Sequence, residues 1–281
     1  LVSRLRVALM FGGRSPEHEV SLVSAAAIHQ AFDEERFEPV LVGVDRAGVP
    51  RVGGAGLLDG GLERGEGVPV RWPVHPGDHH LREAATGTPV GGPIDALFPI
   101  VHGLGGEDGA IQGACAFAGL PCVGAGVLGS ALAMDKDRAR RVLEAERLPV
   151  VRDIVLGDDE RFDAGVRARV ESLGLPVFVK PARAGSSVGV SRVASAEGLQ
   201  EAVDRARRVD RKVVIEEAVA RPREIEVAVL GNRLPQASVP GEIVPHGEFY
   251  DYRAKYEDPE SRLLVPVPLE EALAERVQDL A

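Results

Sequence analysis

The chain has 281 residues, which is enough for two or three domains that each bury a core of their own. Hydrophobic residues make up 44% and charged residues 27%, the balance of a soluble globular protein. The formal net charge of −10 argues against a nucleic acid or an anionic membrane surface as a partner. Any anionic ligand must therefore be held by local basic side chains and backbone N–H groups.

Neither a membrane span nor a secretory signal is indicated, because no apolar run is long enough and the chain start lacks the charged-then-apolar pattern. Cys115 and Cys122 fit neither a CxxC metal pair nor a disulfide framework. We therefore expect two buried thiols in a reducing cytoplasm. Position 1 is Leu rather than Met, so we expect that one end of the natural chain is missing.

The chain opens with the pattern of a βαβ unit. Residues 6–11 form a short apolar run that ends in a Gly-Gly turn, and residues 39–44 supply the next strand. Between them, helical spacing starts at Pro16, with one apolar face made of Val20, Val23, Ala27, Ile28 and Phe32. The N-terminus of such a helix favours an anionic group. The turn lacks GxGxxG spacing, so no dinucleotide fingerprint is present.

The next part of the chain combines loops with a second buried strand. Residues 53–93 are rich in Gly and Pro and predict surface loops with one or two short strands and no chemistry. Residues 94–101 predict a buried strand, and the loop HGLGGEDG follows it at 102–109. Ligands of open α/β sheets bind at the carboxyl ends of strands, so His102 is a candidate ligand contact as well as a turn cap.

Helices and a glycine-containing hairpin follow. Helices are predicted at 110–118, 131–145, within 157–173, and at 196–208. Residues 176–193 predict a β-hairpin with a long polar tip, in which small residues leave backbone N–H groups free to face an anion. Lys180 adds a positive charge beside that tip, so the segment resembles a flap that grips phosphate.

The last part of the chain predicts further strands, a polar segment and a helix. Strands are expected at 212–217 and at 224–230, the latter before a Gly-Asn hairpin turn. The segment EFYDYRAKY at 248–256 gathers three tyrosines with a lysine and an arginine. An amphipathic helix begins at 269 and runs to 280.

Taken together, these motifs resemble the D-alanine–D-alanine ligase family of the ATP-grasp superfamily, from Val7 to the last residue. The parts that carry the resemblance occur in one order: GGRSPEHEVS (12–21), HGLGGEDGAIQG (102–113), MDKDR (134–138), KPARAGSSVGVS (180–191), EEAVARPREIEVAVLGN (216–232) and FYDYRAKY (249–256). Each is weak or moderate alone, but chance matches multiply, so six in order are specific.

The resemblance implies three domains. They are an α/β N-terminal substrate-binding domain at 1–129, with a parallel sheet and flanking helices, a central α+β domain with the phosphate flap at 130–210, and an incomplete ATP-grasp α+β domain at 211–281. ATP would lie between the last two domains and D-alanine towards the first. The family is commonly homodimeric, so a homodimer is expected.

The resemblance also implies an enzyme that spends ATP to join two D-alanines for bacterial wall synthesis. The first D-alanine becomes an acyl phosphate, the amine of the second attacks its carbonyl, and phosphate leaves. No protein nucleophile is needed, so catalysis would depend on positioning and charge neutralisation.

The family's ATP contacts can be carried over by position. Lys136 and Lys180 match the lysines that hold the phosphates, and the flap residues Gly185, Ser186 and Ser187 would close over them. The adenine and ribose contacts match Glu216, Glu217, Val219 and Glu224. The Arg221-Pro222 segment is one residue longer than the family pattern, which affects the ribose contact at Glu224.

The family's substrate contacts fall in three segments. Glu17 matches the carboxylate that holds the ammonium of the first D-alanine, and His102 lies in the same pocket. Ser186 and Tyr256 match a hydrogen-bonded trio with Glu17 that closes the site against water. Lys255 and Tyr256 keep the YxAKY pattern, which the D-lactate-accepting relatives lose, so D-alanine is expected as the second substrate.

The metal ligands of the family lie beyond Ala281. Mg²⁺, with Mn²⁺ as an alternative, bridges the phosphates in such reactions, and the family holds it with Arg-x-Asp and Glu-x-Asn motifs. Since this chain ends before those motifs, it is expected to be a truncated copy that carries no metal ligands.

Three other readings remain open. One is an ATP-grasp carboxylate–amine ligase with another acceptor, including a relative that uses D-lactate. Another is a nucleotide-binding protein without a complete metal site. A nicotinamide dehydrogenase is weaker, because the first glycine turn lacks the required spacing.

Overall fold

The computed structural model describes residues 4–73, 75–245 and 261–281. The chain divides into two compact units, which are described separately. Unit 1 contains Leu1–Ala139 and Arg183–Gly185, and unit 2 contains Arg140–Ala182 and Ser186–Ala281. The finer division into three domains stays a prediction.

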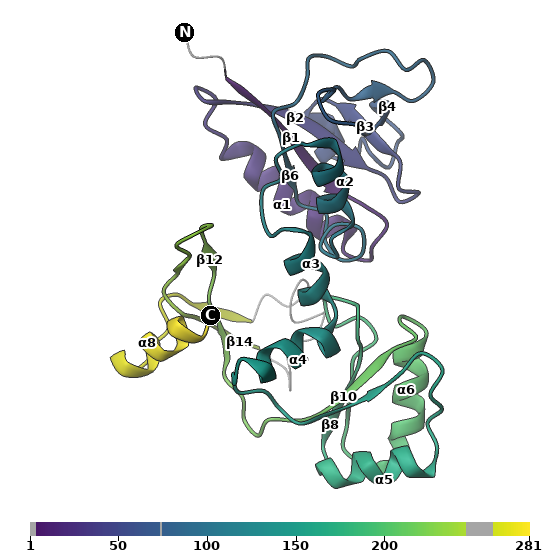
Figure 1. Ribbon diagram of the computed structural model, residues 1–281, viewed down its shortest axis with the longest axis vertical. Helices are drawn as coiled ribbons and strands as arrows, with labels where there is room; N and C mark the ends of the chain where they lie inside the picture. Colours follow the sequence, from purple (N-terminus) through teal and green to yellow (C-terminus); the bar gives the residue numbers. More distant parts are fainter. Residues whose placement is uncertain (1–3, 74, 246–260) are drawn as a thin grey trace. The chain divides into compact units, whose positions relative to one another are not determined.

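Unit 1 is built on a six-stranded mixed sheet with the order β5-β4-β3-β2-β1-β6 (Figure 1). The strands are β1 (Leu5–Gly12), β2 (Phe37–Val44), β3 (Pro50–Gly53), β4 (Val68–Arg71), β5 (Arg82–Glu83) and β6 (Ala96–Pro99). β1 pairs in parallel with β2 and β6, as the sequence predicted. β3, β4 and β5 add an antiparallel edge, and β4 and β5 are the two short strands allowed for in residues 53–93. That region was expected to lie at the surface, but it also contributes Leu57, Leu62 and Leu81 to the core.

Alternation along β1 gives the sheet two apolar faces. Successive strand residues point to opposite faces. Ala8 and Met10 therefore pack with Cys115 of helix α2 (Ala110–Ala118), while Leu9 and Phe11 pack with Ala25 of helix α1 (His18–Gln30). A strand that is apolar on both faces must be covered on both, which is why helices are needed on each side of the sheet.

Two helix predictions need correction. In α1 the expected apolar face is wrong at Val23, which is 72% exposed, and at Ala27, which is also exposed. The buried positions of the helix are instead His18, Ser21 and Ala25. The helix predicted at 131–145 is two helices, α3 (Val127–Met134) and α4 (Lys136–Ala145). The chain breaks at Asp135, whose φ and ψ of −90° and 100° are extended, so periodicity alone could not reveal the break.

Unit 2 contains an antiparallel sheet with the order β7-β10-β8-β9 (Figure 1). Its strands are β7 (Asp153–Leu156), β8 (Val177–Pro181), β9 (Ser191–Val193) and β10 (Val213–Glu217). β8 and β9 pair as the predicted hairpin. Helices α5 (Ala164–Leu173) and α6 (Leu199–Arg207) contribute to the same apolar cluster as the strands, so they cover one face of this sheet.

The remaining elements of unit 2 are short. The strand predicted at 224–230 is two strands that belong to different sheets. One is a three-stranded sheet with the order β11 (Glu224–Glu226), β14 (Gly241–Val244) and β15 (Arg262–Leu264). The other is a two-stranded sheet of β12 (Val229–Leu230) and β13 (Gln236–Ala237). The predicted last helix is confirmed as α8 (Glu271–Leu280). Short 3-10 turns occur at η1 (Ala55–Leu58) and η2 (Ala196–Gly198). Among the described helices, none is both long and apolar enough to cross a membrane.

A single buried hydroxyl joins three elements of unit 1. The Ser21 hydroxyl on α1 accepts a hydrogen bond from the Gly12 backbone N–H at 2.7 Å and donates to the Ile100 carbonyl oxygen at 2.5 Å. Gly12 ends β1 and Ile100 follows β6, so this side chain ties the carboxyl ends of two neighbouring parallel strands to the helix.

We expect Ser21→Ala to destabilise unit 1 by about 1–3 kcal/mol, because it leaves a buried N–H and a buried carbonyl each without this partner. Ser24→Ala on the same helix is the matched control and should change stability by less than about 0.5 kcal/mol. Denaturant unfolding followed by the fluorescence of Trp72, which lies in unit 1 and is the one tryptophan of the chain, measures both. Equal shifts in the two variants would contradict the joining role of Ser21.

Candidate functional site

The polar face of the unit 2 sheet carries one group of candidate residues. Val177, Val179 and Ile215 point into the core beneath α5 and α6. Because strand residues alternate, Lys180 on β8 and Glu216 on β10 point to the opposite face. The sequence therefore folds with an apolar side that fixes the strands and a charged side that can meet a ligand.

On that face, Glu216 is held between two cations. Lys180 Nζ contacts Glu216 Oε1, and Arg140 Nη2 donates to Glu216 Oε2 at 2.5 Å. Burial raises the pKa of the Glu216 carboxyl, but the adjacent charges of Lys180 and Arg140 outweigh burial and hold that pKa below its ordinary value. The ammonium of Lys180 also lies 5.3 Å from the ring centroid of Phe178, two residues earlier on the strand.

A second carboxylate extends this network. Asp153 starts β7 and is the cross-strand neighbour of Glu216. Arg141 Nη2 donates to its two oxygens at 2.8 and 2.7 Å, and Arg140 Nη1 lies 3.6 Å from Oδ1. Buried carboxylates are tolerated where cations and hydrogen bonds compensate them, so the two arginines of α4 position both acids.

The other residues matched to adenine and ribose lie at the end of β10, in the segment after it and on β11. The Glu217 carboxylate accepts hydrogen bonds from Arg152, which lower its pKa. Val219 is exposed, and its backbone N–H has no hydrogen-bond partner in the part of the chain that the structure describes. Glu224 is partly buried on β11.

The flap tip contains two non-glycine residues in the left-handed region. Ser186 and Ser187 have φ values of 44° and 58°, which are uncommon for residues with a side chain. Gly185 precedes them within unit 1. Also within unit 1, Lys136 Nζ donates to the Ala184 carbonyl oxygen at 2.5 Å, so this lysine already contacts the flap. Strained backbone of this kind is often found at functional sites.

Glu17 lies at the start of α1 and is only 7% exposed. It is the N-cap residue of the helix, not a member of its first turn. A Cβ placed on Gly103 would come within 2.9 Å of Glu17 Oε2, and a Cβ on Gly185 within 3.2 Å. Both glycines therefore leave room for this carboxylate, which brings three separate parts of the sequence together within unit 1.

His102 lies beside this group and pairs with Glu107. Its Nδ1 lies 3.6 Å from Glu107 Oε1, and its Nε2 is buried without a hydrogen-bond partner among the described residues. Glu107 is itself fixed by a 2.7 Å hydrogen bond from the Gly103 N–H. The contact with Glu107 raises the pKa of His102, while burial opposes that rise and Glu17 adds to it. His102 can therefore present a proton from Nε2 to an anionic ligand.

The structure thus brings the predicted residues together in two sets. Unit 1 holds Glu17, His102, Gly185 and Lys136, and unit 2 holds Lys180, Glu216, Glu217, Val219, Glu224, Ser186 and Ser187. A meeting of Glu17 with Ser186 stays a prediction. The predictions for Lys255 and Tyr256 concern residues outside the part of the chain that the structure describes.

Three residues that position the candidates were missed from the sequence. They are Arg140, Asp153 and Glu107. Arg140 lies four residues after Lys136 on the same helix, which is a detectable spacing, and Glu107 lies within the HGLGGEDG motif. Asp153 gave no local signal, because its importance comes from strand pairing.

Metal binding was tested on the described residues as well. Among them, no group of three or more His, Cys, Asp or Glu side chains could hold a metal ion. The described residues therefore offer no metal site.

We expect Glu107→Gln to lower the pKa of His102, because the variant removes the carboxylate that stabilises the imidazolium. Because the pKa of His102 is raised in the folded protein, protonation of His102 stabilises the folded state. This contribution to the free energy of unfolding is complete below the ordinary pKa of 6.5 and is lost as pH rises through the folded-state pKa. The variant should therefore lose stability mainly on the acidic side. NMR titration of the histidines measures the shift. Glu63→Gln, which removes the partner of His18, is the control, and an unchanged His102 pKa in Glu107→Gln would refute the pairing.

Residues 6–125 match the family model described as D-ala D-ala ligase N-terminus, and residues 142–281 match the one described as D-ala D-ala ligase C-terminus. The chain is 46% identical over 292 aligned residues to D-alanine--D-alanine ligase A of Chromobacterium violaceum, covering 100% of this chain and 78% of that protein. It is 43% identical to D-alanine--D-alanine ligase A of Escherichia coli, and the alignment covers 100% of this chain and 79% of that protein.

Solved structures agree with these matches. The D-Ala:D-Ser ligase VanG of Enterococcus faecalis superposes with a TM-score of 0.85 at 30% identity, covering 99% of this chain and 81% of that one. The D-alanine-D-alanine ligase of Coxiella burnetii gives a TM-score of 0.83 at 30% identity, with 99% and 75% covered. Both halves of the sequence and the whole described fold thus lead to one assignment: the chain belongs to the D-alanine–D-alanine ligase family.

Proposed function

We propose that this chain joins two D-alanine molecules with the consumption of ATP, giving D-alanyl-D-alanine for peptidoglycan synthesis. The observation that carries the proposal is the family match over both halves of the chain, with a relative 46% identical along its full length. The charges found at the candidate residues agree with the electrostatic needs of that reaction.

Lys180 and Lys136 are proposed to neutralise the phosphates of ATP. Phosphoryl transfer needs little covalent help from a protein and depends on charge stabilisation and positioning. Without nucleotide, Lys180 pairs with Glu216, so a phosphate can replace the carboxylate as its partner. Arg140 remains beside Glu216 and prevents a buried, uncompensated negative charge when Lys180 turns away. Glu216 is then available to accept hydrogen bonds from the adenine.

The adenine and ribose are proposed to lie along the segment after β10. The exposed Val219 N–H can donate to an adenine nitrogen, and the backbone of Glu217 runs beside it. Glu224 on β11 is proposed as the ribose contact, because a carboxylate accepts hydrogen bonds from both ribose hydroxyls.

Glu17 and His102 are proposed to hold the first D-alanine. The Glu17 carboxylate suits the substrate ammonium, and the unpartnered His102 Nε2 suits the substrate carboxylate and the acyl phosphate formed from it. Because Gly103 and Gly185 have no Cβ, the Glu17 carboxylate can lie close to both backbones, and we propose that it receives the substrate ammonium there. A positioned substrate lowers the entropic part of the barrier.

The flap is proposed to close the site. Gly185, Ser186 and Ser187 would cover the phosphates, and Ser186 would complete a hydrogen-bonded trio with Glu17 and Tyr256. Exclusion of water protects an acyl phosphate from hydrolysis. Lys255 and Tyr256 are proposed to favour an amine as the second substrate.

Two further features belong to the same proposal. Mg²⁺, or Mn²⁺ in its place, is proposed to enter bound to the phosphates of ATP, where it supplies positive charge. The cytoplasm is proposed as the compartment, because the reaction needs ATP. The reducing state of that compartment agrees with two free cysteines, of which Cys115 is buried as expected, whereas Cys122 is only partly buried.

The second substrate is the point on which related enzymes differ. The Enterococcus faecalis neighbour is a D-Ala:D-Ser ligase, while the relatives at 41% to 46% identity carry the D-alanine–D-alanine name. D-Alanine is therefore the preferred second substrate, and D-serine and D-lactate are the competitors to test.

We expect ATP-dependent phosphate release with D-alanine alone, and a lower kcat/KM when D-serine or D-lactate is offered as acceptor. Lys136→Met and Lys180→Met should each lower kcat/KM for ATP by about 100-fold or more, because each removes a positive charge from the phosphates. Lys212→Met is the matched control and should keep activity near that of the unchanged protein. Phosphate release without D-alanyl-D-alanine in the products would contradict the assignment.

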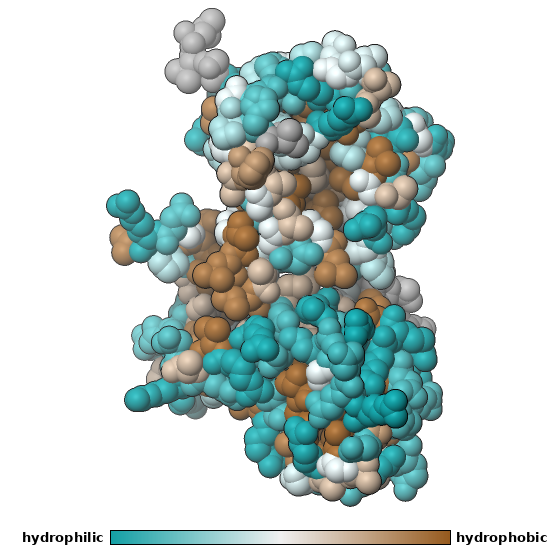
Figure 2. Space-filling view, turned by 45° about the vertical axis from the view of Figure 1, so that its right-hand side comes forward, coloured by the Kyte–Doolittle hydropathy of each residue, from teal (hydrophilic) through white to brown (hydrophobic). Residues whose placement is uncertain are grey.

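A homodimer is also proposed, through an apolar surface on α2 and α3. This surface comprises Phe117, Val123, Val127 and Leu128, and the first and last are each 73% exposed. Hydrophobic side chains reach the surface in several separate places (Figure 2). Phe117 lies on α2, Val127 and Leu128 lie on α3, which contacts α2, and Val123 lies in the segment between them. Exposed apolar patches are typical of an interface.

Replacement of Phe117 and Leu128 by Lys together should convert a dimer to a monomer, because two charges would then be buried at the contact. Val23→Lys, at a similarly exposed position on α1, is the control and should leave the mass unchanged. Light scattering after size-exclusion chromatography measures the mass. A monomer in the unchanged protein would reject the dimer.

A further inference from the structure

The two cysteines of the chain meet beneath helix α2 in unit 1. Cys115 lies on α2 and is fully buried, whereas Cys122 lies after the helix and is only partly buried. Neither residue is among the proposed contacts of ATP or D-alanine. Their position therefore needs an explanation apart from the proposed reaction.

Pairing with the sheet orients Cys122 towards α2. The segment after α2 runs parallel to β6, and Leu97 and Cys122 form an isolated bridge there. The Leu97 N–H donates to the Pro121 carbonyl oxygen and the Val123 N–H to the Leu97 carbonyl oxygen, each at 2.8 Å. Paired residues of neighbouring strands have side chains on the same face of a sheet. Leu97 belongs to the apolar cluster that contains Cys115, and Cys122 packs against that cluster, so both cysteines lie on this face.

The end of α2 fixes the short connection between the cysteines. Gly119 follows the helix in the left-handed region, with a φ of 67°. The Leu120 N–H donates to the Cys115 carbonyl oxygen at 2.9 Å, and the Gly119 N–H donates to the Ala116 carbonyl oxygen at 3.2 Å. This pair of bonds is a Schellman motif, which closes the last turn of a helix. The approach of Cys122 to Cys115 is therefore built into ordered backbone at both ends.

The two thiols are close enough to share a hydrogen bond. This contact lowers the pKa of Cys122 although burial opposes it, whereas the contact and burial together raise the pKa of Cys115. The thiolate is the form of cysteine that reacts with oxidants, and exposure favours the reaction. Cys122 is therefore the reactive member of the pair, and Cys115 is a thiol held beside it.

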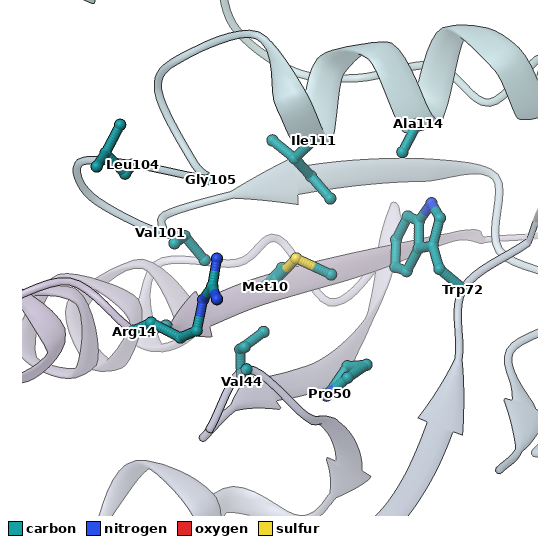
Figure 3. A pocket seen from close by; sticks show the side chains of 12 residues that line it. Met10, Arg14, Val44, Pro50, Trp72, Val101, Leu104, Gly105, Ile111 and Ala114 are labelled. Carbon is teal, nitrogen blue, oxygen red and sulfur yellow. The ribbon is translucent and has the colours of Figure 1, made fainter. Parts of the chain in front are cut away.

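Space next to Cys115 allows the small movement that a bond between the sulfurs requires. The sulfurs of a disulfide lie about 2 Å apart, closer than two thiols in contact. Ala114, the neighbour of Cys115 on α2, borders an apolar cavity of about 250 Å³ (Figure 3). Other residues that line this cavity include Met10, Arg14, Trp72 and Ile111. A helix that borders a cavity loses fewer contacts when it shifts than a helix that is closely packed on all sides.

We propose that Cys115 and Cys122 form an oxidative modification site, at which a peroxide converts the two thiols to a reversible disulfide within the chain. The Cys122 thiolate attacks one oxygen of H₂O₂, which breaks the O–O bond, forms a sulfenic acid and releases hydroxide. The Cys115 sulfur then attacks the Cys122 sulfur, and the Cys115 proton leaves with the hydroxyl group as water.

The two sulfurs are oxidised and the peroxide is reduced, so the electrons balance. A dithiol restores both thiols by exchange. Disulfides that form in a reducing compartment are usually transient and typical of catalysis or redox sensing. The proposal does not depend on the ligase activity.

The test treats the whole folded chain with H₂O₂ and then alkylates the remaining thiols in denaturant. We expect both free thiols to be lost, and the intact mass to fall by two hydrogen atoms. After proteolysis one cross-linked peptide should contain Cys115 and Cys122, and dithiothreitol should restore both thiols. The same chain unfolded in urea is the control and should form the disulfide roughly tenfold or more slowly, because only the fold holds the thiols together. No ATP or D-alanine is present, so the result is independent of the ligase assay.

Two single-cysteine variants separate the roles of the thiols. In Cys115→Ser the sulfenic acid at Cys122 has no thiol beside it, so it should accumulate and react with dimedone. In Cys122→Ser the buried Cys115 should acquire dimedone roughly tenfold or more slowly. Circular dichroism and the thermal midpoint show whether each variant is folded, and the labelling rates are compared between folded variants.

Four results would overturn the proposal. They are the survival of both thiols in peroxide, disulfides between chains in place of the one within the chain, equal rates of disulfide formation in the folded and unfolded chain, or equal dimedone labelling of the two variants. The first three are measured on the unchanged protein, so they hold even if a variant does not fold.

Discussion

A buried carboxylate has to be matched by positive charge or by hydrogen bonds, and each unit of this chain contains one at its candidate site. Glu216 is compensated by Lys180 and Arg140 on the polar face of the unit 2 sheet. Glu17 lies where two glycines leave space for its oxygens. In the proposed reaction, Lys180 exchanges Glu216 for a phosphate, and Glu17 binds the substrate ammonium. This combination allows tight positioning without a protein nucleophile.

The arginines and lysines of this chain have different roles at the candidate site. Arginine supplies most of its 33 basic residues, and the lysines are only Lys136, Lys180, Lys212 and Lys255. Arginine forms the supporting ion pairs, as at Arg140 and Arg141, because its planar group can bridge two carboxylate oxygens. Lysine is a compact and mobile point charge that can move from a carboxylate to a phosphate. The two kinds of cation therefore have different parts in the proposed site.

The loop after β6 serves two regions of unit 1. Its glycines allow the chain to turn so tightly that a Cβ on Gly106 would lie 1.9 Å from the Val101 carbonyl oxygen. One side of the loop approaches Glu17, and the other lines the cavity that contains Arg14 and Trp72. Glu107 and the Ser21 hydroxyl fix the loop and the strand end that precedes it.

Local motifs were sufficient to predict the family, the first parallel strands, the flap hairpin and the positions of the lysines and acids matched to ATP. These follow from local motifs and from alternation, which depend only on neighbours along the chain. Tertiary structure alone decided the break at Asp135, the burial of Ser21 rather than Val23, and the pairing of Asp153 with the arginines of α4. Each of these depends on which strand or helix packs beside a residue, and residues far apart in the sequence supply that partner. The cavity lined by Trp72 and Arg14 could not be predicted from the sequence either, because its walls come from five separate segments.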